Sequence, residues 1–169
     1  MRSWKMTLPR TGGAMMALTL ACGLLLPGSA AAQSAEASGE VDWEKKPYII
    51  QEGKVDYGVY NGYRRYHSYC HVCHGPDGMG STYAPALKDS LNAMSYSDFL
   101  EVVVNGREDL SAGKESVMPA FAEAQDVMLY IDHIYAYLKA RANDAVGRGR
   151  PDRLPADKDP VFQEWKASQ

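Results

Sequence analysis

The chain has 169 residues, 46% of them hydrophobic, with 18 basic and 21 acidic residues and a formal net charge of −3. This length is typical of a single globular domain, and the acidic balance argues against a protein that binds nucleic acid. Three cysteines are too few for a disulfide framework.

Residues 1–32 have the composition of a secretory signal peptide. Three basic residues are followed by a mostly apolar run at 14–26 and by small residues that end at Ala32. The apolar run is too short to span a membrane. We therefore expect cleavage near Ala32, export to the periplasm and no membrane span. The alternative is a lipoprotein-type cleavage that would lipidate Cys22.

Removal of this leader takes away three basic residues and no acidic ones, so the remaining chain has a formal net charge of −6. Changes in composition divide the chain into four predicted segments. They are a signal peptide at 1–32, an N-terminal arm at 33–52, one domain at 53–142 and a C-terminal extension at 143–169.

The first predicted helix covers residues 55–70. Val59, Gly62, Tyr63 and Tyr66 recur at steps of three and four, which places them on one helix face. A glycine inside a helix costs roughly 1 kcal/mol relative to alanine. Gly62 therefore predicts a point where another helix approaches closely.

The end of this helix carries the pattern C-x-x-C-H, formed by Cys70, Cys73 and His74. Two thiols at this spacing can each form a thioether to one vinyl group of a haem, and the adjacent imidazole can then bind the iron. The alternatives are a zinc half-site, a redox dithiol and a disulfide. The sequence has no second C-x-x-C, and the adjacent histidine favours a c-type haem.

A haem-ligating histidine usually donates its second ring N–H to a carbonyl group. Pro85, eleven residues after His74, is a candidate for that carbonyl, and an ordinary loop proline is the alternative. Further along, Ser95 and Asp98 predict the capped start of a second helix that stops at Gly106. Residues 107–117 are polar and are predicted to be irregular.

An iron bound by His74 needs a sixth ligand or an open site. Met118 lies in a predicted loop, far from His74 in the sequence and stiffened by Pro119, so we favour its thioether as that ligand. A methionine that only fills the core is the alternative. The other candidate side chains are Met79, Met94, Met128, His67, His71 and His133.

The last predicted helix covers residues 125–141 and is the most regular. Its apolar positions follow the helical period, while Lys139 falls on the polar face. We expect the apolar face to pack at Gly62. Beyond it, glycines and prolines break the periodicity of residues 143–169, where Arg148, Arg150 and Arg153 predict a local basic patch. We expect a solvated tail that wraps the domain, and an element that docks a partner is the alternative.

Together these motifs resemble a class I c-type cytochrome over residues 53–142. The ordered match comprises Gly62, Tyr66, the C-x-x-C-H-G pattern, Pro85 with Leu87, Asn105-Gly106, Met118-Pro119, and Ile134, Tyr137 and Leu138. The resemblance implies an all-α cytochrome c fold, with three or more helices packed around one covalently bound haem. It also implies that Cys70 and Cys73 attach the haem, that His74 and Met118 ligate the iron, and that Pro85 orients His74.

The same resemblance implies a periplasmic monohaem carrier of single electrons rather than an enzyme. Residues 63–66 and 147–151 are similar to cytochromes associated with bacterial methanol oxidation, which implies electrons from a pyrroloquinoline-quinone (PQQ) methanol dehydrogenase. A terminal oxidase or another acceptor would receive them, and we expect a monomer. The alternatives are a haem subunit of a larger respiratory or dehydrogenase complex, or a ligand-binding haem protein if Met118 is not a ligand.

Overall fold

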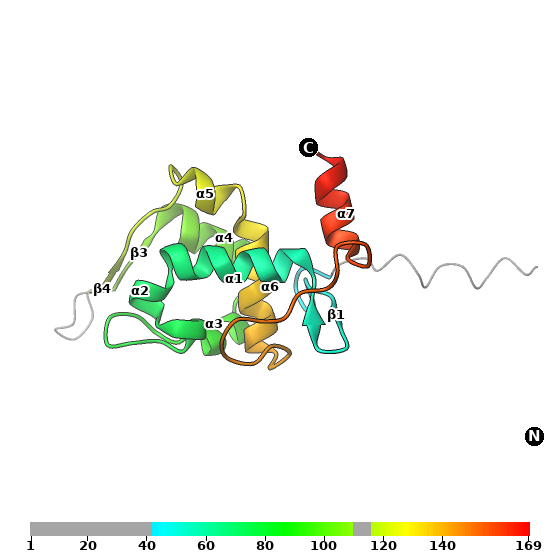
Figure 1. Ribbon diagram of the computed structural model, residues 1–169. Coiled ribbons are helices and arrows are strands. Elements are labelled where there is room, and N and C mark those ends of the chain that lie inside the picture. Colours follow the sequence, from blue (N-terminus) through cyan, green and yellow to red (C-terminus); the bar gives the residue numbers. More distant parts are fainter. Residues whose placement is uncertain (1–41, 110–115) are drawn as a thin grey trace, which may run out of the picture. The chain divides into compact units, whose positions relative to one another are not determined.

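The computed structural model describes residues 42–109 and 116–169, which belong to one compact unit built mainly of helices (Figure 1). The predicted signal peptide lies outside these residues. No helix in the described ranges is long and apolar enough to cross a membrane. In chain order the helices are α1 (Tyr57–Tyr69), α2 (His71–His74), the 3-10 helix η1 (Pro76–Gly78), α3 (Leu87–Ala93), α4 (Tyr96–Asn105), α5 (Gln125–Met128), α6 (Ile131–Ala142) and α7 (Pro160–Ala167).

Two short antiparallel ladders accompany the helices. Strand β1 (Ile50–Gln51) pairs with β2 (Lys54–Val55), and β3 (Arg107–Asp109) pairs with β4 (Ser116–Met118). The predominantly helical class predicted from the sequence is confirmed. The irregular conformation predicted for residues 107–117 is wrong at both of its ends. All three β3 residues are exposed, so their sequence lacks the alternation of polar and apolar residues that indicates a strand.

Helix α1 begins two residues later than predicted. The carboxylate of Asp56 caps it by accepting a hydrogen bond from the backbone N–H of Val59 at 2.9 Å. Val55, expected in the helix, belongs to β2 and is 1% exposed. The predicted core face is otherwise present, since Val59 and Tyr66 are fully buried.

Helices α1 and α6 cross at Gly62, as the sequence predicted. A Cβ atom at Gly62 would overlap the backbone carbonyl of His133 and would lie 3.0 Å from the Cβ atom of Tyr137. Only glycine permits this approach. The crossing buries Ile134, Tyr137 and Leu138 of α6, and burial of each such side chain contributes about 1.5–3 kcal/mol.

The single terminal helix predicted at 125–141 is instead two helices, α5 and α6. The chain leaves helical geometry at Tyr130, where φ is −122° and ψ is 22°. Leu129 lies at this break and is 74% exposed. The apolar positions keep a helical spacing across the break, because Val127 and Ile131 are both buried. Periodicity alone therefore could not reveal it.

Helix α3 was not expected from the sequence. It is short and has no side-chain cap, but Leu91 is fully buried and packs in the core against α6. The last turn of α3 also explains why Lys139 is not exposed as the sequence predicted. This residue was placed on the polar face of the last helix, yet it is buried because its Nζ donates a hydrogen bond to the Leu91 carbonyl at 2.8 Å.

Helix α4 begins as predicted. Ser95 accepts a hydrogen bond from the Asp98 N–H, and the Asp98 carboxylate accepts one from the Ser95 N–H, which completes the capping box. Gly106 ends the helix with a positive φ of 74°, a conformation that favours glycine.

The C-terminal residues run alongside the start of α1 and end in α7, a helix not expected from the sequence. The Val55 N–H donates to the Asp152 carbonyl, and the Leu154 N–H donates to the Val55 carbonyl, each at 2.8 Å. Asp159 then caps α7 and Pro160 starts it. Figure 1 shows α7 beside the N-terminal end of α1.

The three arginines of the predicted basic patch in this segment each make a contact with another side chain. Arg148 pairs with Asp77, and Arg153 pairs with Asp159. The Arg150 guanidinium lies over the ring of Tyr60. Arg148 and Arg150 therefore have partners on the domain, whereas the ion pair of Arg153 lies within the extension and its guanidinium also lies over the ring of Tyr57 on α1.

Candidate haem site

An apolar cavity lies between the end of α1, helices α3 and α4, strand β4, and helices α5 and α6. Its lining includes Cys70, His74 and two methionines, and its other walls are aliphatic or aromatic. The lining residues are Cys70, His74, Leu87, Leu91, Met94, Phe99, Val102, Val103, Met118, Phe121, Val127, Ile131, Ile134 and Leu138.

The C-x-x-C-H pattern forms the junction of α1 and α2. The N–H groups of Cys73 and His74 both donate to the carbonyl of Cys70, at 3.3 and 3.0 Å. This turn places Cys70 and His74 on the same face, because residues three and four apart are neighbours on a helix. Both line the cavity, whereas Cys73 is exposed and is not one of the lining residues.

The two cysteines are free thiols in the structure. Burial, and then the proximity of Cys73, raises the pKa of the Cys70 thiol to about 12. The thiol therefore stays neutral in its apolar surroundings. A thioether is also uncharged, so attachment of a haem at this sulfur would bury no charge.

His74 is held in one orientation by backbone contacts. Its Nδ1 atom lies 3.0 Å from the carbonyl oxygen of Pro85. Since a carbonyl only accepts, Nδ1 carries the proton and Nε2 keeps its lone pair. The carbonyl of His74 accepts a hydrogen bond from Gly80 N–H at 2.7 Å, and the side chain is buried. This arrangement leaves Nε2 available to a metal.

Tyr66 supports the loop that follows His74. Its hydroxyl donates to the Gly75 carbonyl at 2.5 Å and accepts from the Gly78 N–H at 3.0 Å. Burial raises the pKa of this phenol, so it remains protonated and keeps donating. The sequence indicated Tyr66 as a packing residue and gave no sign of these two hydrogen bonds.

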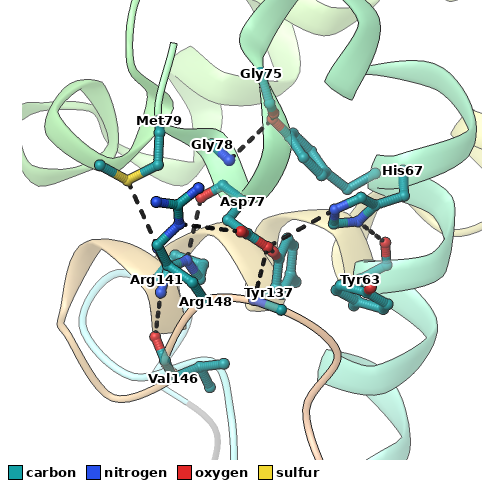
Figure 2. Close-up of polar contacts among 12 residues, drawn as sticks. Tyr63, His67, Gly75, Asp77, Gly78, Met79, Tyr137, Arg141, Val146 and Arg148 are labelled. Carbon is teal, nitrogen blue, oxygen red and sulfur yellow. Dashed lines mark hydrogen bonds and ion pairs between the residues drawn. The ribbon is translucent and has the colours of Figure 1, made fainter.

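Asp77 organises the other side of the same loop (Figure 2). The residue has a positive φ of 61° and is 5% exposed. Its carboxylate lies 3.4 Å from Arg148 Nε and 3.8 Å from His67 Nε2, and it accepts from the Gly149 N–H at 3.1 Å. In the sequence, Asp77 stands out only as part of the turn Gly75-Pro76-Asp77-Gly78. An acidic residue in the turn directly after the C-x-x-C-H pattern, together with the arginines of the C-terminal extension, was the signal that could have identified it.

Arg141 completes this cluster from α6. Its Nε donates to the Asp77 carbonyl at 3.1 Å, and Nη1 donates to the Val146 carbonyl at 2.5 Å. Its Nη2 contacts the sulfur of Met79 at 3.7 Å. The cluster therefore ties the loop after His74 to α6 and to the start of the C-terminal extension.

Met118 is positioned by the second ladder. It pairs with Arg107, and the Phe121 N–H donates to the Val103 carbonyl at 3.0 Å, which holds the segment against α4. A Cβ atom at Gly106 would lie 2.6 Å from the Met118 carbonyl oxygen, so glycine is required there as well. Met118 thus joins the cavity lining from the strand β4 rather than from the predicted loop.

Of the alternative candidates for the sixth iron ligand, only one lines the cavity. Met94 lines the cavity together with Met118, whereas Met79 and Met128 are not among the lining residues. Among the described histidines, His74 alone lines the cavity. A covalently attached haem fits these residues, because thiol, imidazole and thioether are its protein ligands and apolar walls suit the macrocycle.

Comparisons with known proteins identify the family. Residues 59–138 match the family model described as cytochrome c oxidase, cbb3-type, subunit III. Cytochrome c-555 of Methylococcus capsulatus (strain Bath) is 36% identical over 100 residues, which cover 59% of this chain and 75% of the relative. The chain belongs to the c-type cytochromes. The resemblance seen in the sequence is thereby confirmed, and membership of this family implies a covalently bound haem c and its iron.

Two further c-type cytochromes are more similar in sequence. Cytochrome c-553I of Paracoccus denitrificans is 53% identical over 103 residues, or 61% of this chain, but the match spans only 46% of that relative's length. The crystal structure of c-type cytochrome XoxG from Methylobacterium extorquens AM1 has 48% identity and a TM-score of 0.61. That match covers 72% of this chain and 74% of XoxG. The segment that shares its fold with XoxG is therefore longer than residues 59–138, which match the family model.

Proposed function

We propose that this c-type cytochrome is a periplasmic monohaem carrier of single electrons. The observation that supports the proposal most directly is the apolar cavity lined by Cys70, His74 and Met118 together. A haem c held there would supply the one-electron chemistry of its iron. With two protein ligands on the iron, no position is left for a substrate, which favours a carrier over an enzyme.

The proposed roles of the residues follow from their surroundings. Cys70 and Cys73 would attach the haem. His74 would bind the iron through Nε2, with Pro85 fixing the ring through Nδ1–H. Met118 would be the second axial ligand, and a thioether in that position stabilises ferrous iron and raises the reduction potential.

The assignment of Met118 is tested by replacing the two methionines that line the cavity, one at a time. The ferric protein should show a methionine-to-iron charge-transfer band that is lost in Met118→Ala and kept in Met94→Ala. Carbon monoxide should bind readily to the ferrous Met118→Ala protein only. A band that survives Met118→Ala and disappears in Met94→Ala would assign the ligand to Met94 instead.

A second candidate function is a haem subunit held permanently in a larger complex. The description of the matching family model names an oxidase subunit, and cytochrome c-553I is much longer than the matched segment. Gel filtration of the native protein from periplasmic extract separates the two functions. A lone monomer supports the carrier, and stable co-elution with other subunits supports the complex.

For the electron donor we propose a PQQ-dependent methanol dehydrogenase. The support is the similarity of residues 63–66 and 147–151 to cytochromes associated with methanol oxidation. Stopped-flow mixing of the ferric cytochrome with the reduced dehydrogenase should give rapid haem reduction, while a PQQ dehydrogenase for an unrelated sugar substrate serves as the control. Equal rates with both donors would contradict the proposed specificity. The same assay with candidate terminal oxidases tests the acceptor.

The periplasmic location is proposed from the signal-peptide pattern of residues 1–32. Fractionation of cells should recover the haem-stained protein in the periplasm. Mass spectrometry of that protein should find an N-terminus at Gln33. Retention of residues 1–32, or a lipid on Cys22, would contradict the proposed cleavage.

A further inference from the structure

A second cavity, of about 310 Å³, lies away from the candidate haem site. It is bounded by residues 43–49, the start of α1, the start of α6, and α7. This volume falls at the lower end of the range of about 300–1,000 Å³ that is usual for small-molecule sites. The lining residues are Trp43, Pro47, Tyr48, Ile49, Asp56, Gly58, Asp132, His133, Ala136, Val161, Glu164, Trp165 and Ser168.

Two tryptophans contribute aromatic walls, and each is held by neighbouring rings. The Trp43 ring lies 5.4 Å from that of Tyr96, measured between centroids. Trp165 lies 5.0 Å from Tyr57 and 5.8 Å from Phe162. Both indoles therefore pack against aromatic neighbours at the cavity. Among aromatic side chains, the indole of tryptophan attracts a cation most strongly.

The charged groups of the lining are all acidic. Asp56, Asp132 and Glu164 are carboxylic acids, and neither lysine nor arginine is among the lining residues. Asp56 is already occupied, because it accepts hydrogen bonds from the N–H groups of Ile49 and Val59. Asp132 accepts a hydrogen bond from the Tyr96 hydroxyl through Oδ1, so its second carboxylate oxygen is available to a ligand. Glu164 is exposed at the rim on α7.

His133, which also lines the cavity, adds no positive charge to it. Its Nδ1 accepts a hydrogen bond from the amide of Asn61 at 2.9 Å, which requires the ring to be unprotonated at that nitrogen. Burial also lowers its pKa. The cavity therefore combines aromatic faces, a neutral imidazole and carboxylates, a combination that favours an organic cation over an anion or a neutral molecule.

We propose that this cavity binds an alkylammonium group, with its carbon atoms between Trp43 and Trp165 and its charge facing Asp132 and Glu164. The proposal concerns a site separate from the haem and does not depend on the electron-carrier function. A free small amine and a lysine side chain of another protein share this chemistry. A comparison of two probes distinguishes these sources.

The test uses the reduced holoprotein and follows the indole N–H resonances of Trp43 and Trp165 by NMR. Butylammonium chloride should shift both in a saturable manner, while 1-pentanol, of similar size and uncharged, should not. Sodium chloride at equal ionic strength controls for salt. Saturation by 1-pentanol with the same affinity would overturn the proposal, since the cavity would then recognise only apolar bulk.

Variants assign the recognition to these side chains. Trp165→Phe keeps an apolar ring on α7 and should weaken butylammonium binding about threefold or more. Glu164→Gln should weaken it about twofold to fivefold, whereas Glu101→Gln, the same charge change at an exposed position of α4, should have no effect. Equal affinities in wild type, Glu164→Gln and Trp165→Phe would also overturn the proposal.

Finally, Nα-acetyl-lysine methylamide presents the same ammonium group on a peptide backbone. Binding of butylammonium without binding of this compound assigns the site to a free amine. Binding of both with similar affinity shows that a protein's lysine can enter. Failure of both probes overturns the proposal and leaves the electron-carrier function untouched.

Discussion

Gly62 on α1 faces the backbone carbonyl of His133 on α6 with no room for a side chain between them. This contact sets the distance between the two helices that hold the candidate haem site from one side. Cys70 and His74 follow α1, and Ile131, Ile134 and Leu138 of α6 line the cavity. The close approach at this glycine therefore helps to position Cys70 and His74 relative to α6.

Gly62→Ala should destabilise the holoprotein by about 2–3 kcal/mol, because a methyl group forces the two backbones apart and disturbs a close-packed core. Gly147→Ala is a matched control, since a Cβ there meets nothing within 4 Å, and it should change stability by no more than about 0.5 kcal/mol. Denaturant unfolding followed by circular dichroism measures both. Equal midpoints for the two variants would show that α1 and α6 can separate at little cost.

Tyr66→Phe should destabilise the protein by about 1–3 kcal/mol. The change leaves the Gly75 carbonyl and the Gly78 N–H without their buried partner. Tyr69→Phe removes a hydroxyl that contacts Asp126 on the exposed surface and should cost about 0.5 kcal/mol or less. Thermal unfolding compares the two variants, and a larger loss for Tyr69→Phe would contradict the role given to the Tyr66 hydroxyl.

Local signals in the sequence predicted the features that depend on near neighbours. The capping box at Ser95 and the close approach at Gly62 both follow from residue types at fixed positions, and both are present. The family was recognised from an ordered set of such local motifs, beginning with C-x-x-C-H. The fold class followed from the family rather than from any one helix.

Features that depend on distant residues were not predictable in this way. Lys139 is buried because a carbonyl of α3 happens to lie within reach of its ammonium group. Arg148 of the C-terminal extension pairs with Asp77, which lies more than 70 residues earlier in the chain. Helix α7 is stabilised by aromatic contacts to Tyr57. Tertiary contacts, and not local helix propensity, determine the burial of Lys139, the pairing of Arg148 and the formation of α7. The predicted segment boundaries at 52, 53, 142 and 143 stay predictions.

The stability of the protein should fall as the pH is lowered below about 6.5, with His133 as one cause. Burial lowers the pKa of His133 from its ordinary 6.5, so below that pH the unfolded chain binds more protons than the folded one and stability decreases. His133→Gln should flatten this part of the curve. Denaturation about one unit above and about one unit below pH 6.5 measures the slope. Parallel curves for both proteins would exclude His133 as a contributor.

Electron transfer from the physiological donor should slow as salt is added. The chain without its predicted leader has a formal net charge of −6, and we expect the donor to present a basic rim. Screening over about 10 Å at 0.1 M salt would weaken their attraction. Stopped-flow reduction at increasing salt measures the effect, with reduction by dithionite showing whether salt alters the haem itself. A rate with the donor that does not depend on salt would contradict electrostatic steering.

The protein should fold poorly when haem cannot be attached. A domain of about 90 residues has a small core that often needs a cofactor, and here the residues around the cavity are core residues such as Leu91, Val127 and Leu138. Cys70→Ala/Cys73→Ala should therefore lose helix content, as seen by far-ultraviolet circular dichroism. A Ser68→Ala variant, which removes an exposed hydroxyl from the preceding turn of α1, controls for mutation near the motif and should keep its haem and helices. Full native helix content in the double variant would show that the side chains of the cavity specify the fold without the cofactor.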